Sequence, residues 1–345
     1  MTASDSAGAT QRWRVLVAFA AIYTIWGSTY LAIRFAIETM PPFLMGSARY
    51  LIAGAILYAL TRRQHTAPIP RIHWRSAFII GGLLLLGGNG GVIWAEQIIP
   101  SGLAALLIAT VPLWMALLNW LGGDHVRPNL GVTVGLGLGL LGIVLLVSPD
   151  QAASGDSVNP AGVLVLVLAA LSWSIGSLYS RKAQLPSAPL LATAMEMLAG
   201  GALLLVAGLV TGEAGQIRLE QVSPRSLLAL GYLIVFGSLM GFTAYIWLLR
   251  VSTPARVSTY AFVNPVVAVF LGWALAGESL TPRTLAAAAV IVTAVVLIVA
   301  NQARASRQPT GDATLMKDRE SGLRPIVAPA TSRALHRRIE ADGGN

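Results

Sequence analysis

Ten apolar stretches of about 20 residues each are the feature that most restricts how this chain can fold. About 20 apolar residues in a helix cross the hydrocarbon core of a bilayer. Inside that core, each backbone N–H and C=O needs a partner within the protein. The stretches therefore predict an all-α integral membrane protein with ten transmembrane helices. We expect these helices at residues 13–36, 42–61, 75–95, 101–121, 130–148, 161–180, 189–211, 226–249, 254–276 and 283–301.

Composition agrees with a membrane protein and excludes several functions. Of the 345 residues, 55% are hydrophobic and 11% are charged, whereas about a quarter of a soluble domain is charged. There is no cysteine, and the four histidines fall in loops or the tail, so we expect no metal site and no cofactor. The formal net charge of +9 does not indicate a nucleic-acid partner, because it lies mostly in short loops and the last 44 residues.

The N-terminus resembles the start of a signal peptide, with two arginines before an apolar run. The run covers residues 15–37, which is long enough to span a bilayer, and no small-residue cleavage site follows a short core. We therefore interpret it as a retained first helix.

The second half of the sequence repeats the first. At an offset of 153 residues, the matching positions are Gly88 with Gly241, Trp94 with Trp247, Pro112 with Pro265 and Trp120 with Trp273. We predict two copies of one five-helix unit, at residues 1–148 and 161–301, joined by a polar linker at 149–160. Residues 302–345 are polar and basic, and we predict that they form a disordered cytoplasmic tail.

The distribution of Lys and Arg predicts the orientation. With the N-terminus in the cytoplasm, ten basic residues lie at the inner ends of the helices and three at the outer ends, as the positive-inside rule requires. Both termini are then cytoplasmic. Because five is an odd number, the second copy enters the membrane in the opposite direction. Such inverted repeats are typical of secondary transporters, whose halves exchange conformations around a central site.

Small residues line two of the predicted helices. Gly131, Gly135 and Gly139 recur every four residues in the fifth helix, and residues 286–289 give the tenth a similar surface. Small residues permit close packing of helices in membranes. They indicate either ordinary packing or a contact between two copies, so a monomer and a homodimer are both open.

An amide and an acid interrupt the third apolar stretch. Asn89 and Glu96 are seven residues apart, about 20° short of two helical turns, and should project from one face. A carboxylate at membrane depth is costly without a partner or a water-filled cavity. Glu96 is thus our first candidate for coupling protons or binding a cationic part of the substrate. The alternatives are that headgroup water solvates Glu96 near Pro100, and that Asn89 makes an interhelical hydrogen bond.

Two more charged residues lie inside predicted helices. Glu196, about seven residues into the seventh helix, either lines the pathway or pairs with a loop arginine such as Arg181. Arg49 lies roughly 12 Å into the second helix at 1.5 Å per residue. It either snorkels toward the headgroups, binds an anionic group of the substrate or pairs with Glu96.

The ninth predicted helix contains polar residues next to a proline. Tyr260 and Asn264 share a face, and Pro265 frees a backbone carbonyl one turn earlier. Freed backbone groups at membrane depth tend to line cavities. Because Pro112 occupies the matching position in the fourth helix, we predict a symmetric pair of kinks.

Aromatic residues offer a further candidate surface. Trp26 in the first helix and Trp173 in the sixth either form walls for an aromatic or amphipathic substrate or serve in packing and at the interface. The first helix also carries Arg34 and Glu38, whose i, i+4 spacing indicates a surface pair.

Short motifs occur throughout both halves. They are IWGSTY at 25–30, PP at 41–42, RYL at 49–51, GNG at 88–90, AE at 95–96, PSGLAA at 100–105, ATVP at 109–112, SWSIGS at 172–177, EML at 196–198, STYAFVNP at 258–265 and GE at 277–278. Together they resemble the EamA-type transporters of the drug/metabolite transporter superfamily, in particular the YedA-like exporters. The resemblance covers residues 13–301. It implies a ten-helix carrier of the bacterial inner membrane that exports small metabolites by alternating access.

The resemblance does not name the substrate, because the family carries amino acids, sugars, nucleosides and drugs. The second-half motif Gly277-Glu278 matches the family, whereas the first half has Gly123-Asp124. Both pairs lie at loop entries, and we interpret them as structural.

A secondary transporter of small organic solutes in the lipid bilayer is therefore the function we predict, with protons as a candidate coupling ion. One alternative is a uniporter that dissipates the gradient of amino acids or similar metabolites. Another is a membrane enzyme acting on a lipid-linked substrate, which would need a cluster of catalytic groups that the sequence lacks. A channel would need a repeated filter or charged ring, and an ATPase would need a P-loop. Neither occurs.

Overall fold

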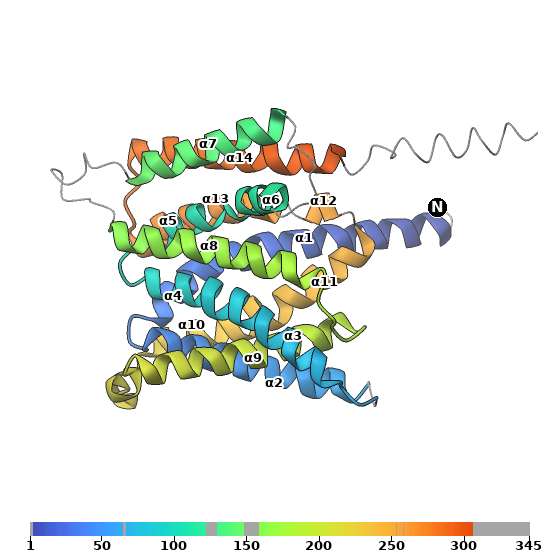
Figure 1. Ribbon diagram of the computed structural model, residues 1–345, viewed down its shortest axis with the longest axis vertical. Helices are drawn as coiled ribbons and strands as arrows, with labels where there is room; N and C mark the ends of the chain where they lie inside the picture. The colour runs from blue at the N-terminus through green and yellow to red at the C-terminus, as the bar shows by residue number, and fades with distance from the viewer. Residues whose placement is uncertain are drawn as a thin grey trace, which may run out of the picture. The chain divides into compact units, whose positions relative to one another are not determined.

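Helices make up nearly all of the described structure. The computed structural model describes residues 3–64, 67–121, 130–147, 159–252, 254–257 and 259–305. Figure 1 shows the arrangement of the helices. They are α1 (Ala3–Ala36), α2 (Pro42–Arg62), α3 (Arg71–Gly81), the π-helix η1 (Gly82–Gly90), α4 (Gly91–Ala95), α5 (Ser101–Ile108), α6 (Val111–Leu121), α7 (Leu130–Val147), α8 (Pro160–Ser180), α9 (Pro189–Val210), the 3₁₀-helices η3 (Glu213–Gln216) and η4 (Leu219–Gln221), α10 (Pro224–Tyr232), the π-helix η5 (Leu233–Met240), α11 (Gly241–Val251), α12 (Pro254–Val257), α13 (Tyr260–Ala276) and α14 (Pro282–Ala305).

The ten predicted helices are confirmed. Four of them consist of consecutive segments: α3, η1 and α4; α5 and α6; α10, η5 and α11; and α12 and α13. The observed bounds lie within four residues of the expected ones, except that α1 begins earlier, at Ala3. In the described part of the chain, eight helices are long and apolar enough to cross a membrane, and two apolar helices, Leu130–Leu145 and Tyr260–Ala276, are shorter.

Proline and polar caps explain where several helices begin. Helices α2, α8, α9 and α10 each start with proline, which suits the first turn because the N–H it lacks would have no intrahelical partner there. The side chain of Asn159 accepts a hydrogen bond from Ala161 N at 3.0 Å and caps α8. Ser223 caps α10 in the same way, through Ser226 N at 3.1 Å.

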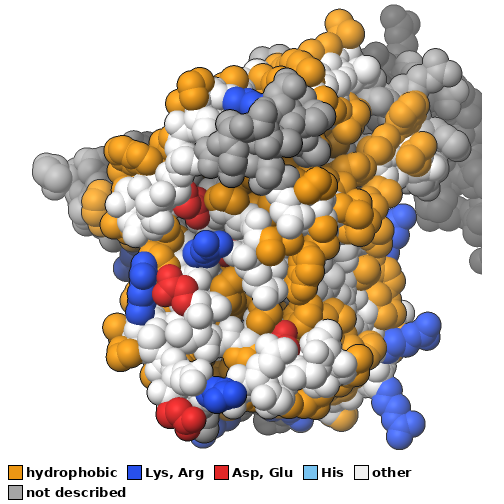
Figure 2. Space-filling view, turned by 90° about the vertical axis from the view of Figure 1, so that its left-hand side faces the viewer, with side chains coloured by type: hydrophobic (Ala, Val, Ile, Leu, Met, Phe, Trp, Pro, Cys, Tyr) orange, Lys and Arg blue, Asp and Glu red, His pale blue; other side chains and the backbone are white. Residues whose placement is uncertain are grey.

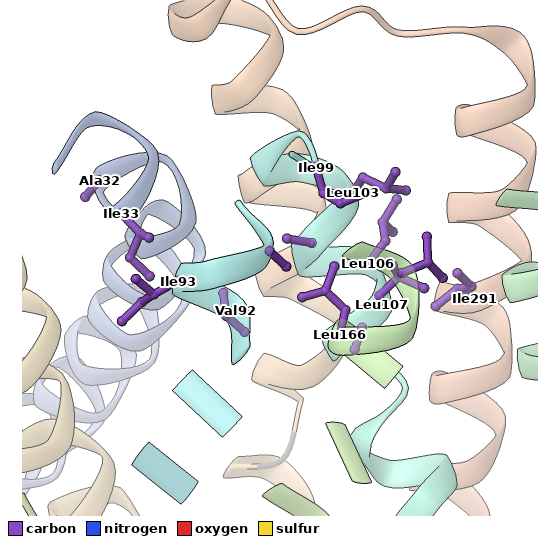
Figure 3. Close-up of a cluster of buried hydrophobic side chains, with 14 of the residues drawn as sticks. Ala32, Ile33, Val92, Ile93, Ile99, Leu103, Leu106, Leu107, Leu166 and Ile291 are labelled. Atoms are coloured by element: carbon purple, nitrogen blue, oxygen red, sulfur yellow. The ribbon is translucent and has the colours of Figure 1, made fainter. Parts of the chain in front are cut away.

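The largest buried apolar cluster combines helices from both halves of the sequence. Figure 3 shows Ile33 of α1 beside Ile93 of α4, and it shows Leu107 of α5, Leu166 of α8 and Ile291 of α14 in the same region. All five side chains are at most 2% exposed. The described residues up to Ala303 form one compact unit, which contains the described parts of both predicted repeats.

The glycine stripe of α7 packs against α14 within the same chain, and Figure 1 shows the two helices side by side. A Cβ atom added to Gly131 would lie 2.2 Å from Asn301, and one added to Gly135 would lie 2.6 Å from Ile298. At Gly139 the nearest neighbour would be Leu113 of α6, at 2.1 Å. The stripe therefore serves close packing inside one copy, while a homodimer stays a prediction.

The predicted symmetric pair of kinks is matched by a break between helices in the first half, while a kink at Pro265 stays a prediction. In the fourth predicted helix, α5 ends at Ile108 and α6 begins at Val111, next to Pro112 as expected. In the ninth, α12 ends at Val257 and α13 begins at Tyr260, five residues before Pro265. Helix α13 then continues through Pro265 without interruption. A proline inside a helix removes one hydrogen bond and can bend the helix without ending it.

Two π-helical segments are the feature that the sequence did not indicate. Segment η1 lies in the middle of the third predicted helix and η5 in the middle of the eighth, so they occupy corresponding places in the two halves. A π-helix bonds residue i to i+5; it is rare and is frequently found at functional sites. The 3.6-residue spacing used to place Asn89 and Glu96 on one face therefore does not apply across residues 82–90.

Several predictions concern residues outside the described ranges. They are the last residue of the first repeat, at 148, and most of the linker, at 149–158; the Gly123-Asp124 pair; and most of the tail, at 306–345. Helix α14 extends to Ala305, four residues beyond its expected end.

Candidate functional site

Glu96 ends the third predicted helix and is completely buried. Glu96 is the C-cap residue of α4. Its backbone N–H donates a hydrogen bond to the carbonyl oxygen of Val92 at 3.0 Å. The helix stops here because Pro100, four residues on, disfavours helical backbone just before it. The side chain is 0% exposed, and neither carboxylate oxygen has a hydrogen-bond partner among the described residues. The interpretation that headgroup water solvates Glu96 is not supported by this burial.

Four side chains interact electrostatically with the Glu96 side chain. Arg34, Arg49 and Glu278 are close enough for their charges to act on its carboxyl group, and Tyr30 is within the same reach. Arg34 also donates a hydrogen bond from Nη1 to the backbone carbonyl of Glu96 at 2.7 Å.

Arg49 is buried in the protein and does not snorkel. Its side chain is 3% exposed, and Nε donates to Ser238 Oγ of η5 at 3.0 Å. The guanidinium carbon lies 4.8 Å from the centre of the Tyr50 ring. Nη1 has no hydrogen-bond partner in the part of the chain that the structure describes. No ion pair within 4 Å joins Arg49 to Glu96 there, so the predicted direct pairing is wrong.

Asn89 bonds within its own helix. Its Nδ2 donates to the carbonyl of Leu84 in η1 at 3.3 Å, and the side chain is half-buried. The interhelical hydrogen bond proposed as an alternative is therefore not the one that forms.

Each π-helix receives a hydrogen bond from the first helix of the other half. Trp26 of α1 donates from Nε1 to the carbonyl of Gly237 in η5 at 3.2 Å. Ser172 of α8 donates from Oγ to the carbonyl of Leu83 in η1 at 2.8 Å. In one contact the donor lies in the first half and the acceptor in the second, and in the other contact the donor lies in the second half and the acceptor in the first.

Glycines make room for the tryptophans at these crossings. A Cβ atom at Gly88 would lie 2.7 Å from the Trp173 ring, and one at Gly241 would lie 2.4 Å from the Trp26 ring. Gly88 and Gly241 are the pair that matched in the sequence repeat. Both tryptophans thus pack closely on glycine, which supports the packing interpretation without testing a role in binding.

Trp26 also belongs to an aromatic cluster. Its ring centre lies 5.2 Å from that of Tyr260, 5.2 Å from Tyr245 and 5.4 Å from Phe242. Asn264 lies one turn after Tyr260 on α13, is 8% exposed, and its Oδ1 has no partner among the described residues. Of this cluster, sequence analysis missed Tyr245 and Phe242, because aromatic residues in apolar helices carry no distinguishing pattern.

Glu196 lies apart from the Glu96 group. It is half-buried on α9, seven residues from Pro189 at the start of that helix. Within the described ranges it makes no ion pair with Arg181. The predicted pairing with that loop arginine is thus wrong, and a role in lining the pathway stays a prediction.

Glutamates from the second half cap helices of the first. Glu278 accepts hydrogen bonds from Ser101 N and Oγ, both at 2.7 Å, and from Gly102 N at 3.0 Å. It follows Gly277, whose φ of 66° ends α13 in the left-handed conformation that favours glycine. Glu213 caps α2 in the same manner. The structural role expected for Gly277-Glu278 is consistent with this arrangement.

The predicted pair of Arg34 with Glu38 is wrong. Glu38 instead pairs with Arg225 of α10 at 3.4 Å, and the Arg225 guanidinium lies 3.6 Å from the centre of the Phe35 ring. Figure 2 shows several basic and acidic side chains close together on the face that it views. No group of three His, Asp or Glu side chains that could hold a metal occurs within the described residues.

Comparisons with known proteins identify relatives along most of the chain. The model of the EamA-like transporter family matches residues 12–148 and again 160–300, which suggests duplicated halves. The inner membrane transporter YedA of Escherichia coli is 42% identical over 281 residues, covering 81% of this chain and 88% of YedA. The transporter YoaV of Bacillus subtilis is 26% identical, covering 78% of this chain and 90% of YoaV. Protein PecM of Dickeya dadantii is 27% identical, covering 79% and 88%.

A solved crystal structure shares the fold. It aligns with a TM-score of 0.55 at 22% identity, over 83% of this chain and 97% of the other. With two family matches and a relative above 40% identity, the chain belongs to the EamA-like transporter family.

Proposed function

We propose that the protein is a secondary active transporter that exports small organic metabolites or drugs across the bacterial inner membrane by alternating access. The observation that carries this proposal is Glu96, a fully buried carboxylate without a hydrogen-bond partner in the described ranges. An uncompensated buried carboxylate is costly. Its retention is explained if the group binds and releases a proton or a cation during each transport cycle.

The inverted arrangement of the two repeats is part of the proposal. Its support is the pair of family matches and the reciprocal contacts at η1 and η5. We place the repeats at 1–148 and 161–301, the linker at 149–160 and a cytoplasmic tail at 302–345. The bias of Lys and Arg toward one side supports cytoplasmic termini, and the name of YedA supports the inner membrane.

We assign the coupling and substrate-binding roles to residues in and around this group. Glu96 is the proposed proton-coupling acid, and the others are proposed to contact or guide the substrate: Asn89, Arg49, Glu196, Tyr260, Asn264, Trp26 and Trp173. Glu196 lies apart from Glu96 and would act at another stage of the pathway.

Transport in proteoliposomes tests this function. Purified wild type and Glu96→Gln would be compared for uptake driven by a pH gradient and for counterflow at saturating solute. The panel would contain amino acids, nucleosides and cationic dyes. Glu220→Gln, in the exposed part of the loop between α9 and α10, is the matched control. We expect Glu96→Gln to lose gradient-driven uptake and keep counterflow, because exchange of solute for solute needs no proton.

Other outcomes would correct the proposal. If both activities survive in Glu96→Gln, then Glu96 is not the coupling acid and another group carries the proton. If the wild type itself shows counterflow but no uptake driven by the pH gradient, the protein is a uniporter. If the solute leaves the vesicles chemically altered, the enzyme alternative replaces transport.

A further inference from the structure

The Glu278 cap joins the two halves of the chain at one end of α5. Its carboxylate accepts hydrogen bonds from Ser101 N and Oγ, both at 2.7 Å, and from Gly102 N at 3.0 Å. Ser101 and Gly102 belong to the first predicted repeat, whereas Glu278 follows α13 in the second. The three hydrogen bonds therefore fasten the end of α13 to the start of α5.

Glycines let α13 and α5 approach each other closely beside this cap. A Cβ atom on Gly102 would lie 3.0 Å from the Cα atom of Val269, and one on Gly272 would lie 2.3 Å from the Glu278 carboxylate. The backbone N–H of Glu278 donates to the carbonyl of Gly272 at 3.1 Å, which folds the residue back over α13. The carboxylate is thus held between the two helices.

The helix that begins at Ser101 is divided, so its first segment can move by itself. Helix α5 packs against α13 (Figure 1) and ends at Ile108. Helix α6 begins at Val111, whose carbonyl accepts a hydrogen bond from Ser174 of α8 at 3.1 Å. Leu113 of α6 also belongs to a buried cluster with residues of α7 and α14. Separation of α5 from α13 therefore leaves these contacts of α6 in place.

The cap is placed where water can replace it. The N–H groups of Ser101 and Gly102 lie in the first turn of α5, where a helix offers them no acceptor of its own. Glu278 is half-buried, and in the proposed orientation this end of α5 faces the outer side of the membrane. Water can solvate both the freed N–H groups and the freed carboxylate there. The contact is thus reversible.

We propose that the Glu278 cap is the latch of an outer gate. In the described conformation it holds α13 against α5 and closes the outer side between the two repeats. In the opposite conformation the carboxylate leaves α5 and the two helix ends separate. This inference rests on the proposed alternating-access function and orientation, and it names a residue that sets the balance between the two conformations.

Glu213 provides a control with the same chemistry. It caps α2 from the segment after α9, through Phe43 N at 3.1 Å and Leu44 N at 2.9 Å. Helices α2 and α9 also pack closely far from this cap, because a Cβ atom on Gly54, roughly three turns along α2, would lie 3.0 Å from the nitrogen of Leu198. Loss of the Glu213 cap should therefore lower stability without separating the helices.

Electron–electron double resonance between two spin labels measures the gate directly. The chain has no cysteine, so labels at Gln97→Cys and Leu275→Cys attach without competing sites. Gln97 lies before α5 and is exposed, Leu275 lies on α13 and is 61% exposed, and neither belongs to the cap. Distances would be recorded in lipid nanodiscs for this doubly labelled parent and for the parent with Glu278→Gln, Ser101→Ala or Glu213→Gln.

The parent should show mainly the short distance of the closed gate. In Glu278→Gln, the ratio of the long-distance population to the short-distance population should rise about tenfold or more, because an amide nitrogen would face a backbone N–H and at least one charge-assisted hydrogen bond is lost. Ser101→Ala removes only the Oγ contact, which makes it the milder variant, and should raise the ratio about fivefold. Glu213→Gln should leave the ratio unchanged.

The latch is refuted if Glu278→Gln and Ser101→Ala keep the distances of the parent. It is also refuted if Glu213→Gln shifts them equally, because that result indicates general loosening. Solute flux by the wild type, together with unshifted distances in both latch variants, would leave the proposed function intact while this inference fails. Shifted distances without flux of any solute would instead refute the transport function and keep Glu278 as the group that holds α13 to α5.

Discussion

Helices α3 and α9 cross so closely at Gly81 that adding a single methyl group there should push the two helices apart. A Cβ atom on Gly81 would lie 2.7 Å from the carbonyl oxygen of Glu196 and 2.7 Å from the nitrogen of Gly200. Ordinary contacts of Cβ atoms begin at 3.4 Å. Both neighbours are backbone atoms, so no side chain can rotate away, and the helices must shift by about 0.7 Å to relieve Gly81→Ala.

The expected cost follows from two opposing effects. Overpacking costs about 1–3 kcal/mol, while alanine favours a helix over glycine by about 1 kcal/mol. Gly81→Ala should therefore lower the free energy of unfolding by about 0–2 kcal/mol. Gly231→Ala is the matched control, because a Cβ atom there would meet nothing within 4 Å and only the helix-forming gain of up to about 1 kcal/mol remains.

Reversible unfolding in mixed detergent and dodecyl sulfate micelles, followed by tryptophan fluorescence, measures both variants. We expect their unfolding free energies to differ by about 1–3 kcal/mol, which is the overpacking cost, because both variants share the helix-forming gain. Equal stability of Gly81→Ala and Gly231→Ala would refute the close backbone crossing of α3 and α9.

The same titration checks two further variants. Glu213→Gln should lower the free energy of unfolding by about 1–2 kcal/mol. Glu213 is 5% exposed and its two carboxylate oxygens cap α2, whereas the amide nitrogen of glutamine would face a backbone N–H. A loss of stability no larger than in the exposed control Glu220→Gln would contradict this. Glu38→Gln should change stability by less than about 0.5 kcal/mol, because Glu38 and Arg225 are 38% and 51% exposed and solvent screens them; a cost above about 1 kcal/mol would show a stronger pair.

Apolar length was sufficient to predict the ten helices. A membrane-spanning helix needs about 20 apolar residues, and several of these helices begin with proline. These two signals located the ends of the helices within a few residues. The π-helices η1 and η5 were not predictable in this way, since apolar composition does not distinguish bonds to i+4 from bonds to i+5. Their symmetric positions reflect the repeat that Gly88 and Gly241 had indicated.

The candidate site was predictable only in part. Arg49 and Glu96 attracted attention because charges are rare in membrane helices, and the structure brings them within electrostatic reach. The contact of Arg34 was missed because Glu38, four residues away, satisfies the helical spacing rule. The actual acceptor of the Arg34 hydrogen bond is the carbonyl oxygen of Glu96, 62 residues away in sequence. The cap that Glu278 provides was missed for the same reason, because it depends on tertiary packing.

The capping of first-half helices by second-half glutamates has a consequence for the time course of synthesis. Glu213 follows Phe43 by 170 residues, and Glu278 follows Ser101 by 177. At about 5–20 residues per second, a ribosome needs roughly 9–35 seconds to produce each cap after the helix that uses it. Until then the backbone N–H groups in the first turns of α2 and α5 must donate to water or lipid headgroups. The newly made first half therefore lacks these two helix caps while the second half is being synthesised.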